Sequence, residues 1–377
     1  MKQHGNQHFV PQFYFRRFSG GRNAINLILV ASGETIQDAP IKGQCAAHNF
    51  YGSKELELLF GGLEGAHAKT LKTIGDAAWK GDLSGVTSEN IASLCEVVLF
   101  QRSRTALEFD KSKDVPNAMA LPAFRAHIAT APCIKDRQRI LEAIDKRQLR
   151  IEETRVSAVL QAMDIAMDGV LLVSDLALCV LRNHTKYPFI FSDSPVVFYN
   201  TLMRDVTSRG VLGLQSPGLQ IFYPISPNMI LMMYDEATYS IAHTSLIDVK
   251  ELWDVSQLNA LQLQHSLDAV YFGDSAAQQY VSDLWWAHRR NVDGPKMETR
   301  TLRNVLVRGQ SEPCDVLLHL EPHLKLRLGL SFISCEPIRD RDYRFRHRSP
   351  QLVAEHREWI KLNEASAGRT SRALKGG

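Results

Sequence analysis

The sequence predicts an α+β fold in which strands from the N-terminal, central and late parts of the chain form an antiparallel or mixed sheet. A large helical block is inserted between them. Short apolar runs bounded by turn residues cluster near the start and again over residues 189–234. Between these clusters, apolar residues recur at helical spacing over roughly residues 55–182. The strands do not alternate regularly with helices, so a doubly wound parallel sheet is not expected.

The N-terminal strands are expected to form a small β-rich unit. Residues 24–30 read Ala-Ile-Asn-Leu-Ile-Leu-Val, a short apolar run that is typical of a strand, and Ser32-Gly33 follows as a turn. Further extended segments are expected over residues 35–41 and 45–51.

The helical block follows this unit. Helices are expected over residues 55–74, 91–107 and 134–158, one or two more over 159–180, and broken or short helix over the proline-containing segment 110–133. Thr87 is a candidate N-cap for the second helix.

The second half of the chain returns to strands. They are expected at residues 189–191, 196–199, 219–224 and 229–234, and, near the end, at 299–307, 316–320 and 324–334; helices are expected at 245–271, 275–290 and 351–363.

Composition and the length of the apolar runs argue against a disordered protein and against a membrane-spanning one. The chain has 377 residues, of which 45% are hydrophobic and 23% are charged, as in ordinary globular proteins. We expect one large domain over residues 1–335 and a basic, partly helical tail over 336–377. No apolar run reaches the ~20 residues that a membrane span needs. We therefore expect a cytoplasmic protein without a membrane partner, in which the six scattered cysteines are reduced.

The most informative feature of the chain is the run His-Phe-Val-Pro-Gln-Phe-Tyr over residues 8–14. His8, Gln12 and Tyr14 supply three hydrogen-bonding side chains. Histidine is suited to proton transfer near neutral pH, and Arg16, just downstream, can hold a phosphate or carboxylate. The alternative is that the aromatic residues plug a core while the polar residues cap it.

Two arginines at the polar end of an apolar helix form a second candidate, in the run Gln-Arg-Ser-Arg over residues 101–104. Arg102 and Arg104 are expected either to bind an anionic ligand or to pair internally, with Glu64 or Glu96 as partners.

The third candidate is Asp193, in the turn Ser-Asp-Ser-Pro over residues 192–195 between two apolar strands. A sheet holds such an aspartate rigidly, as a site requires. An Asp-Ser-Pro turn also forms without any function, because the aspartate accepts hydrogen bonds from the following amides.

The opening run resembles the pattern H-[FY]-V-P-x-x-Y-L-x-x-F of an uncharacterised, mainly bacterial family, the domain of unknown function DUF4238. The resemblance covers residues 8–275, with Phe15 where leucine is usual and Ser103 where threonine is common. Further similar passages are Gln-Arg-Ser-Arg at 101–104, Phe-Ser-Asp-Ser-Pro-Val-Val at 191–197, Tyr-Asn at 199–200, Tyr-Pro-Ile-Ser-Pro at 223–227, and Asn259 with Leu261 and Gln262. The resemblance implies no activity.

Our first hypothesis is a nucleic-acid-directed hydrolase, either a nuclease or an RNA-acting toxin of an anti-phage defence system. His8 is its general acid or base, and Asp193 and Glu64 position water or bind a divalent ion, Mg²⁺ or Mn²⁺. The expected phosphate-binding side chains are Gln12, Tyr14, Arg16, Arg102 and Arg104. Residues 338–377 carry ten Lys or Arg and five Asp or Glu, a net charge of +5 that suits a nucleic-acid partner.

Two alternatives remain open. In the first, the same residues form the ligand pocket of a non-catalytic module that senses a nucleotide or a protein partner. A structural scaffold subunit is the third reading, and it predicts no pocket around His8. The sequence contains no phosphate-binding loop, dinucleotide-binding loop, nucleophile elbow or zinc-protease signature that would decide among them.

Overall fold

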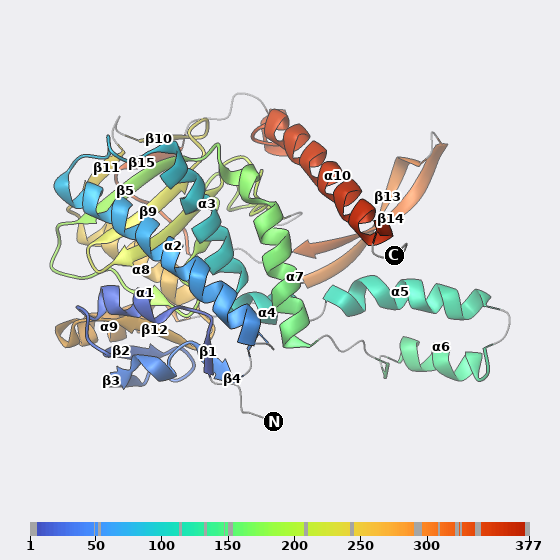
Figure 1. Ribbon diagram of the computed structural model, residues 1–377, viewed down its shortest axis with the longest axis horizontal. Helices are drawn as coiled ribbons and strands as arrows, with labels where there is room; N and C mark the ends of the chain where they lie inside the picture. The colour runs from blue at the N-terminus through green and yellow to red at the C-terminus, as the bar shows by residue number, and fades with distance from the viewer. Residues whose placement is uncertain are drawn as a thin grey trace.

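The computed structural model confirms the α+β fold (Figure 1). It describes residues 6–48, 50–51, 54–112, 115–131, 134–146, 148–149, 154–206, 210–241, 245–289, 296–307, 310–320, 324, 326–335 and 341–373. The remaining positions of the predicted segments, including 336–340 and 374–377 of the tail, lie outside the described residues.

A four-stranded antiparallel sheet joins the start of the chain to its centre. Its order is β3 (Thr35–Pro40), β2 (Ala24–Leu29), β12 (Ala269–Phe272) and β6 (Phe191–Ser192). The early strands therefore share one sheet with the central strand β6, as the sequence predicts. β12 lies in a segment predicted as helix, and the predicted late strands form separate two-stranded sheets, β13 (Lys296–Val307) with β14 (Gln310–Leu320) and β15 (Ile333–Cys335) with β10 (Tyr239–Ile241).

A second sheet of five strands carries the main core. Its order is β11 (Leu246–Val249), β5 (Ala177–Asn183), β9 (Met229–Tyr234), β8 (Gln220–Ser226) and β7 (Val197–Tyr199), with only β11 and β5 parallel. Side chains on both of its faces are buried, Tyr223 and Leu231 on one and Phe222 and Met232 on the other. Burial of both faces explains why these strands are almost continuously apolar.

Helices cover both faces of this sheet. The first face packs against α2 (Lys54–Lys80), α3 (Ser88–Ser103) and α7 (Arg155–Asp168), followed by the turn η2 (Val170–Val173). The second packs against α8 (Leu252–Gln264) and α9 (Gln278–His288), which follows the turn η3 (Ser275–Ala277). Thr87 caps α3 as predicted, because its hydroxyl accepts from the Asn90 amide while the Asn90 side chain accepts from the Thr87 amide.

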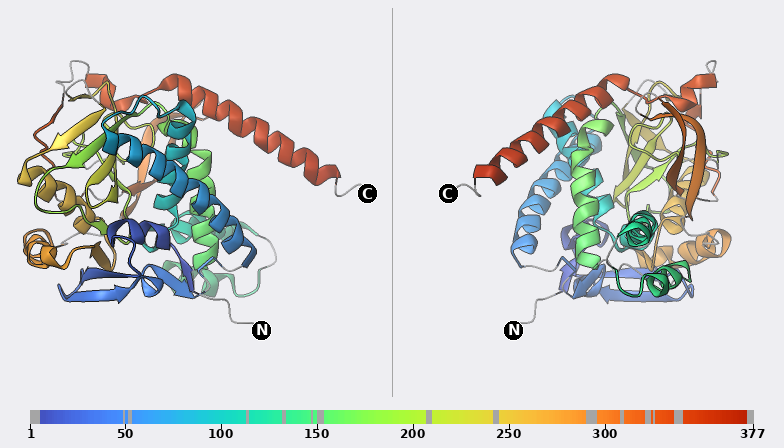
Figure 2. Two further views of the ribbon diagram at one scale, coloured as in Figure 1. Left: turned by 60° about the vertical axis from the view of Figure 1, so that its left-hand side comes forward. Right: turned by 90° about the vertical axis from the view of Figure 1, so that its right-hand side faces the viewer.

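Several elements extend away from this body on the side opposite the strand β11 (Figure 1). They are α5 (Val115–Thr130), α6 (Arg137–Asp145), the hairpin of β13 (Lys296–Val307) and β14 (Gln310–Leu320), and α10 (Pro350–Ala373). Figure 2 shows the C-terminal end of α10 running clear of the body. No helix of the described segments is both long and apolar enough to cross a membrane.

The predicted basic tail is anchored where it leaves the body. The strand β15 (Ile333–Cys335) pairs with β10 (Tyr239–Ile241), and the turn η4 (Arg341–Phe345) follows. The Arg348 guanidinium then donates to both carboxylate oxygens of Asp175, at 2.6 and 2.8 Å. This arginine is therefore used for anchoring rather than for phosphate contacts.

Several predicted segments differ from the structure. The predicted strand 324–334 forms a strand only at its end, in β15, because the amides of Leu326 and Leu328 donate to the side chains of Gln264 and Tyr199 instead of to a neighbouring strand. The predicted helix 134–158 is two helices, α6 and α7, and the predicted helical segment 159–180 ends at Asp168 and continues into β5. The segment 245–271 is a strand, a helix and a strand, because short apolar runs buried on both sides carry no period that separates the two structures. Segment 110–133 forms the longer helix α5, which has Pro116 in its first turn, where no amide donor is needed, and continues through Pro122 in its interior.

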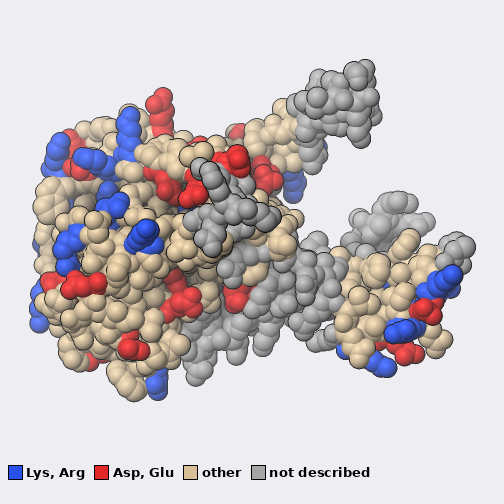
Figure 3. Space-filling model, turned by 60° about the horizontal axis from the view of Figure 1, so that its bottom comes forward, with Lys and Arg blue, Asp and Glu red and all other residues tan. Residues whose placement is uncertain are grey.

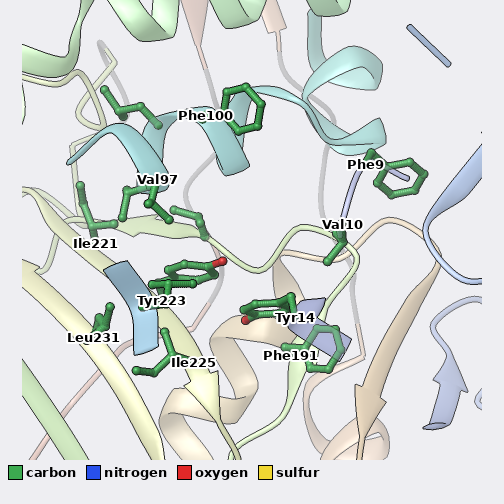
Figure 4. Close-up of a cluster of buried hydrophobic side chains, with 14 of the residues drawn as sticks. Phe9, Val10, Tyr14, Val97, Phe100, Phe191, Ile221, Tyr223, Ile225 and Leu231 are labelled. Atoms are coloured by element: carbon green, nitrogen blue, oxygen red, sulfur yellow. The ribbon is translucent and has the colours of Figure 1, made fainter. Parts of the chain in front are cut away.

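The opening run forms the short strand β1 (Asn6–His8) and the helix α1 (Gln12–Phe18). β1 pairs with β4 (Ala46–His48), which follows the turn η1 (Ile41–Gly43). The Tyr14 ring is fully buried and stacks on Tyr223, with 5.3 Å between ring centroids (Figure 4). Its hydroxyl donates to the Pro224 carbonyl oxygen. Tyr14 is therefore part of the core and does not reach a ligand.

The end of α1 lies directly against β12. A Cβ atom added to Gly273 would lie 1.9 Å from the Phe18 carbonyl oxygen, so only glycine allows this approach. The Gly273 carbonyl accepts hydrogen bonds from Arg22 and Asn26, at 2.9 and 3.3 Å. These contacts hold the opening run against the four-stranded sheet.

Candidate functional site

The strand β1 has a hollow on each side of it. His8 lines one hollow, which we name the His8 pocket, and the next residue, Phe9, lines the other. Phe9 follows β1, and its amide donates to the Cys45 carbonyl at 2.9 Å, which continues the pairing with the chain before β4 by one residue. Successive side chains of an extended chain point to opposite sides, which explains this division. Two of the sequence-predicted residues, His8 and Asp193, consequently line different hollows.

The His8 pocket is open and holds about 370 Å³. His8, Gln12 and Arg16 line it from β1 and α1, and Glu64 lines it from α2. The structure thus brings together four of the predicted site residues, drawn from two segments about 50 positions apart.

The ring of His8 is held in one tautomer. Its Nε2 atom lies 3.2 Å from the Lys42 carbonyl oxygen, which can only accept, so Nε2 carries the proton. The Nδ1 atom is then the basic atom of the ring. Burial lowers the pKa of His8 more than the Lys42 carbonyl and the Glu64 carboxylate raise it, so the ring is neutral at pH 7.

Arg104 holds the back of the pocket. Its side chain is only 1% exposed, and its guanidinium donates to the Glu64 carboxylate at 2.8 Å and to the Tyr51 hydroxyl at 2.7 Å. It also donates to the His8 carbonyl oxygen. Arg104 therefore positions both His8 and Glu64, and it realises the internal pairing with Glu64 that the sequence left open. Burial lowers its pKa, but Tyr51 and Glu64 raise it by more.

Two glycines leave the α2 side of the pocket bare. Gly61 and Gly65 line it, and a Cβ atom at either position would meet nothing within 4 Å. Glycine in a helix costs roughly 1 kcal/mol relative to alanine, and here no close packing requires it. The signal that reveals this part of the site in the sequence is a pair of glycines inside a helical pattern.

The opposite wall is polar. The Arg16 guanidinium donates to the Gln12 side-chain oxygen at 3.0 Å and to Asn23 at 3.2 Å. Arg16 is exposed, so its charge remains available to an anion that enters the pocket.

Arg102 points elsewhere and lines neither hollow. Its guanidinium pairs with Glu108 at 3.4 Å and stacks over the Phe198 ring at 4.1 Å. It also lies 3.4 Å from Nε2 of His265, whose Nδ1 donates to the Ser194 carbonyl. His265 and Glu108 were not predicted, because they approach Arg102 only in the folded chain.

The Asp193 carboxylate binds backbone amides. Its carboxylate accepts from the amides of Leu267, Asp268 and Ala269, at 2.9, 2.6 and 3.1 Å. Burial raises the pKa of Asp193 to about 6, and the three amides lower it only in part. The carboxylate thereby ties β6 to the start of β12, and its partners are amides of a distant segment instead of the following amides of the turn that the alternative named. Asp193 also lines the second hollow.

The His8 pocket combines a neutral base, a carboxylate, an amide and a guanidinium on one open surface. Such a set can bind a phosphate and move a proton beside it. A divalent ion in this pocket would have Glu64 and His8 as its candidate protein ligands. No group of three His, Cys, Asp or Glu suited to a metal occurs among the described residues. On the face shown in Figure 3, Lys and Arg are interspersed with Asp and Glu and do not merge into one basic surface.

Replacing His67 by phenylalanine is expected to change how stability depends on pH. His67 packs edge-on against Phe100, 5.1 Å between centroids, and burial, aided by Arg104, lowers its pKa to about 4. The unfolded chain takes up this proton below about pH 6.5, but the folded chain does so only below about 4. The native state is therefore destabilised by up to about 3 kcal/mol as the pH falls through this window.

Urea unfolding at pH 7, 5.5 and 4 measures this effect as the difference between the wild type and His67→Phe. The difference should change in favour of the variant as the pH falls. The exposed His48 provides the control, since His48→Phe should follow the wild type throughout. Parallel stability curves for the wild type and His67→Phe would contradict the prediction.

Comparison with known proteins returned one family model. It is described as "Protein of unknown function (DUF4238)" and matches residues 6–276. No curated protein and no solved structure matches the chain. The matched region includes β1, α1, the His8 pocket and both central sheets.

Proposed function

The chain belongs to the DUF4238 family, and we propose that it is a nucleic-acid-directed hydrolase that cleaves a phosphodiester bond in the His8 pocket. The observation that carries the proposal is the convergence of His8, Gln12, Arg16 and Glu64 on one open pocket. A polymeric substrate needs an open site, because the chain must enter and leave sideways.

The arrangement supports acid–base cleavage. Nδ1 of the neutral His8 removes a proton from the attacking hydroxyl, which is either water or the neighbouring 2′-hydroxyl of RNA. That oxygen forms a bond to phosphorus while the bond to the leaving oxygen breaks, and the leaving oxygen takes a proton from solvent or from protonated His8. Arg16 and Gln12 bind the phosphate oxygens, and Glu64 orients the attacking hydroxyl. Glu64 would also be the carboxylate that holds a divalent ion, which would supply charge stabilisation for the phosphate.

The structure changes the roles that the sequence predicted for the other residues. Arg104 becomes a positioning residue, because its guanidinium binds Glu64 and the His8 carbonyl. Arg102 and Asp193 bind protein groups outside the His8 pocket, and Tyr14 is buried in the core. The proposed phosphate contacts are therefore reduced to Gln12 and Arg16.

Substitution of His8 by glutamine tests the proposal. General acid–base catalysis by one side chain contributes about 10²–10⁴-fold, so cleavage of fluorescent RNA or DNA oligonucleotides should fall by at least about 100-fold. Arms with Mg²⁺, Mn²⁺ or a chelator identify the cofactor, and growth of bacteria that express the protein tests for a toxin. The matched control is His48→Gln, which changes an exposed histidine on the neighbouring strand β4. Equal cleavage by His8→Gln and wild type would overturn the proposal.

A second experiment closes the pocket without weakening the fold. Gly61→Leu places a side chain in the pocket, whereas Gly62→Leu alters the adjacent position of α2, which does not line it. Both changes raise helix propensity by roughly 0.5–1 kcal/mol, so neither should destabilise the protein. Only Gly61→Leu should lose cleavage. Loss in both variants would indicate a general effect on α2.

A second candidate function is a non-catalytic module that senses a nucleotide. It is favoured by the fact that His8 and Glu64 are both already held by protein groups, the Lys42 carbonyl and Arg104. Stabilisation by a nucleotide without cleavage, lost in Arg16→Gln, would support this candidate. The scaffold reading predicts no pocket at His8 and is the least supported.

A further inference from the structure

The hollow on the Phe9 side of β1 is larger than the His8 pocket and has a different chemistry. We name it the Asp193 pocket; it holds about 510 Å³, a size typical of small-molecule sites. Phe9, Phe50 and Phe109 contribute aromatic walls, and Leu27 and Leu29 of the sheet add aliphatic ones.

The polar groups of this pocket are acceptors and neutral donors. Three carboxylates line it, those of Asp110, Asp193 and Asp268, and none of its described lining residues is Lys, Arg or His. Cys45 and Tyr271 also line it, with 3.4 Å between the thiol and the hydroxyl. Burial raises the pKa of both well above its usual value, so both remain neutral at pH 7.

This lining excludes a phosphate and selects for hydrogen-bond donors. Carboxylates accept from amino groups and repel anions and carbonyl oxygens. Flat aromatic walls favour a planar ring. Asp193 keeps its carboxylate in place through three amides, so an acceptor in the pocket is positioned before any ligand arrives.

We propose that the Asp193 pocket binds a planar ring that carries an amino group, supplied by an adenine, cytosine or guanine base of the nucleic acid. That the ring belongs to a nucleic acid rests on the proposed function. That it is planar and carries an amino group rests on the lining of the pocket. The two pockets beside β1 then bind different parts of the substrate. The phosphate binds in the His8 pocket and the base binds in the Asp193 pocket.

Uracil, which lacks an exocyclic amino group, distinguishes recognition of that group from binding of any base. Adenine, cytosine and guanine each present an exocyclic amino group, and aspartate is known to accept from such a group on cytosine. Uracil instead presents one ring N–H between two carbonyl oxygens, which would face carboxylates. One net hydrogen bond is worth roughly 1 kcal/mol and a hydrogen bond to a charged group more, so uridine should bind about tenfold more weakly.

Nucleosides test the pocket separately from the phosphate site, because they contain no phosphate. Cytidine, adenosine, guanosine and uridine are titrated into the full chain, and binding is followed by saturation-transfer NMR. At least one of the three amino-bearing nucleosides should bind at least tenfold more tightly than uridine. Binding should persist in His8→Gln, which separates failure of this inference from failure of the proposed hydrolase.

Two variants test whether the nucleoside binds in the Asp193 pocket. Gly43 lines the pocket, and a Cβ atom there meets nothing within 4 Å, so Gly43→Phe should fill the space and abolish nucleoside binding. Asp268→Asn removes one exposed lining charge and should weaken binding several-fold. The matched controls are Gly85→Phe and Glu34→Gln, which lie outside the pocket and should bind like the wild type.

Three results would overturn the inference. The first is that no amino-bearing nucleoside binds, and the second is that uridine binds as tightly as the other three. The third is that benzylamine, an aromatic amine without a base or sugar, binds the pocket while a short RNA does not compete with it. That last result would assign the pocket to a free amine instead of a base.

Discussion

Replacing Arg104 with methionine is expected to lower the free energy of unfolding by about 3–5 kcal/mol, the usual cost of removing one partner of a buried ion pair. Methionine keeps most of the volume but leaves the Glu64 carboxylate without its cation. It also leaves the Tyr51 hydroxyl oxygen without the Arg104 donor, while the His8 carbonyl keeps the Tyr51 hydroxyl at 3.2 Å as its donor. Each unsatisfied buried group adds about 1–3 kcal/mol. The partial exposure of Glu64, at 25%, moderates the total.

Urea unfolding followed by circular dichroism measures this loss. The control is Arg125→Met, which breaks the exposed ion pair with Asp145 and should stay close to the wild type. Glu64→Gln in the Arg104→Met background should recover part of the loss, because it removes the uncompensated charge. Equal effects of Arg104→Met and Arg125→Met would contradict the view of Arg104 as the residue that holds the pocket together.

Asp193→Ala is expected to cost at least about 3 kcal/mol, because three amides lose their only side-chain acceptor at once. Asp193→Asn should fall between alanine and wild type, since it keeps one acceptor oxygen but brings an NH₂ group against amide donors. The control is Asp274→Ala, which removes one exposed cap of η3 and should cost about 1 kcal/mol.

The pH dependence of Asp193→Ala has a definite sign. Burial raises the pKa of Asp193 to about 6, so the folded chain takes up this proton more readily than the unfolded chain does. Its contribution is fully present below about pH 4 and is lost as the pH rises through 6. The cost of the substitution, measured by urea unfolding, should therefore be larger at pH 4 than at pH 7. A cost that grows toward neutral pH would contradict the assigned shift.

These two predictions concern residues that the sequence singled out as candidates for chemistry. Polar runs beside apolar segments contain Arg102, Arg104 and Asp193. That pattern is the same for a ligand site and for a structural ion pair or hydrogen bond. The structure separates the two outcomes by burial and by partner. Arg104 meets Glu64 and His8, whereas Asp193 meets three amides of a distant loop.

The passages that carry the family resemblance meet around the opening run. Gln101 donates to the Phe9 carbonyl at 2.9 Å, and Tyr14 and Arg17 donate to the carbonyls of Pro224 and Ile225. Phe191 packs against Phe15, 5.1 Å between ring centroids. Much of the motif set therefore serves to position β1 and α1.

The sequence by itself determined the α+β class, the strands β2, β3, β8 and β9 and the cap of α3, because these depend on local spacing and turn chemistry. It did not separate strand from helix where apolar runs are buried on both sides, as in β5 and β12. Only the tertiary structure decided that His8 shares a pocket with Glu64 while Asp193 does not. That outcome depends on which side of β1 each neighbour packs, and contacts between residues far apart in the chain leave no local pattern.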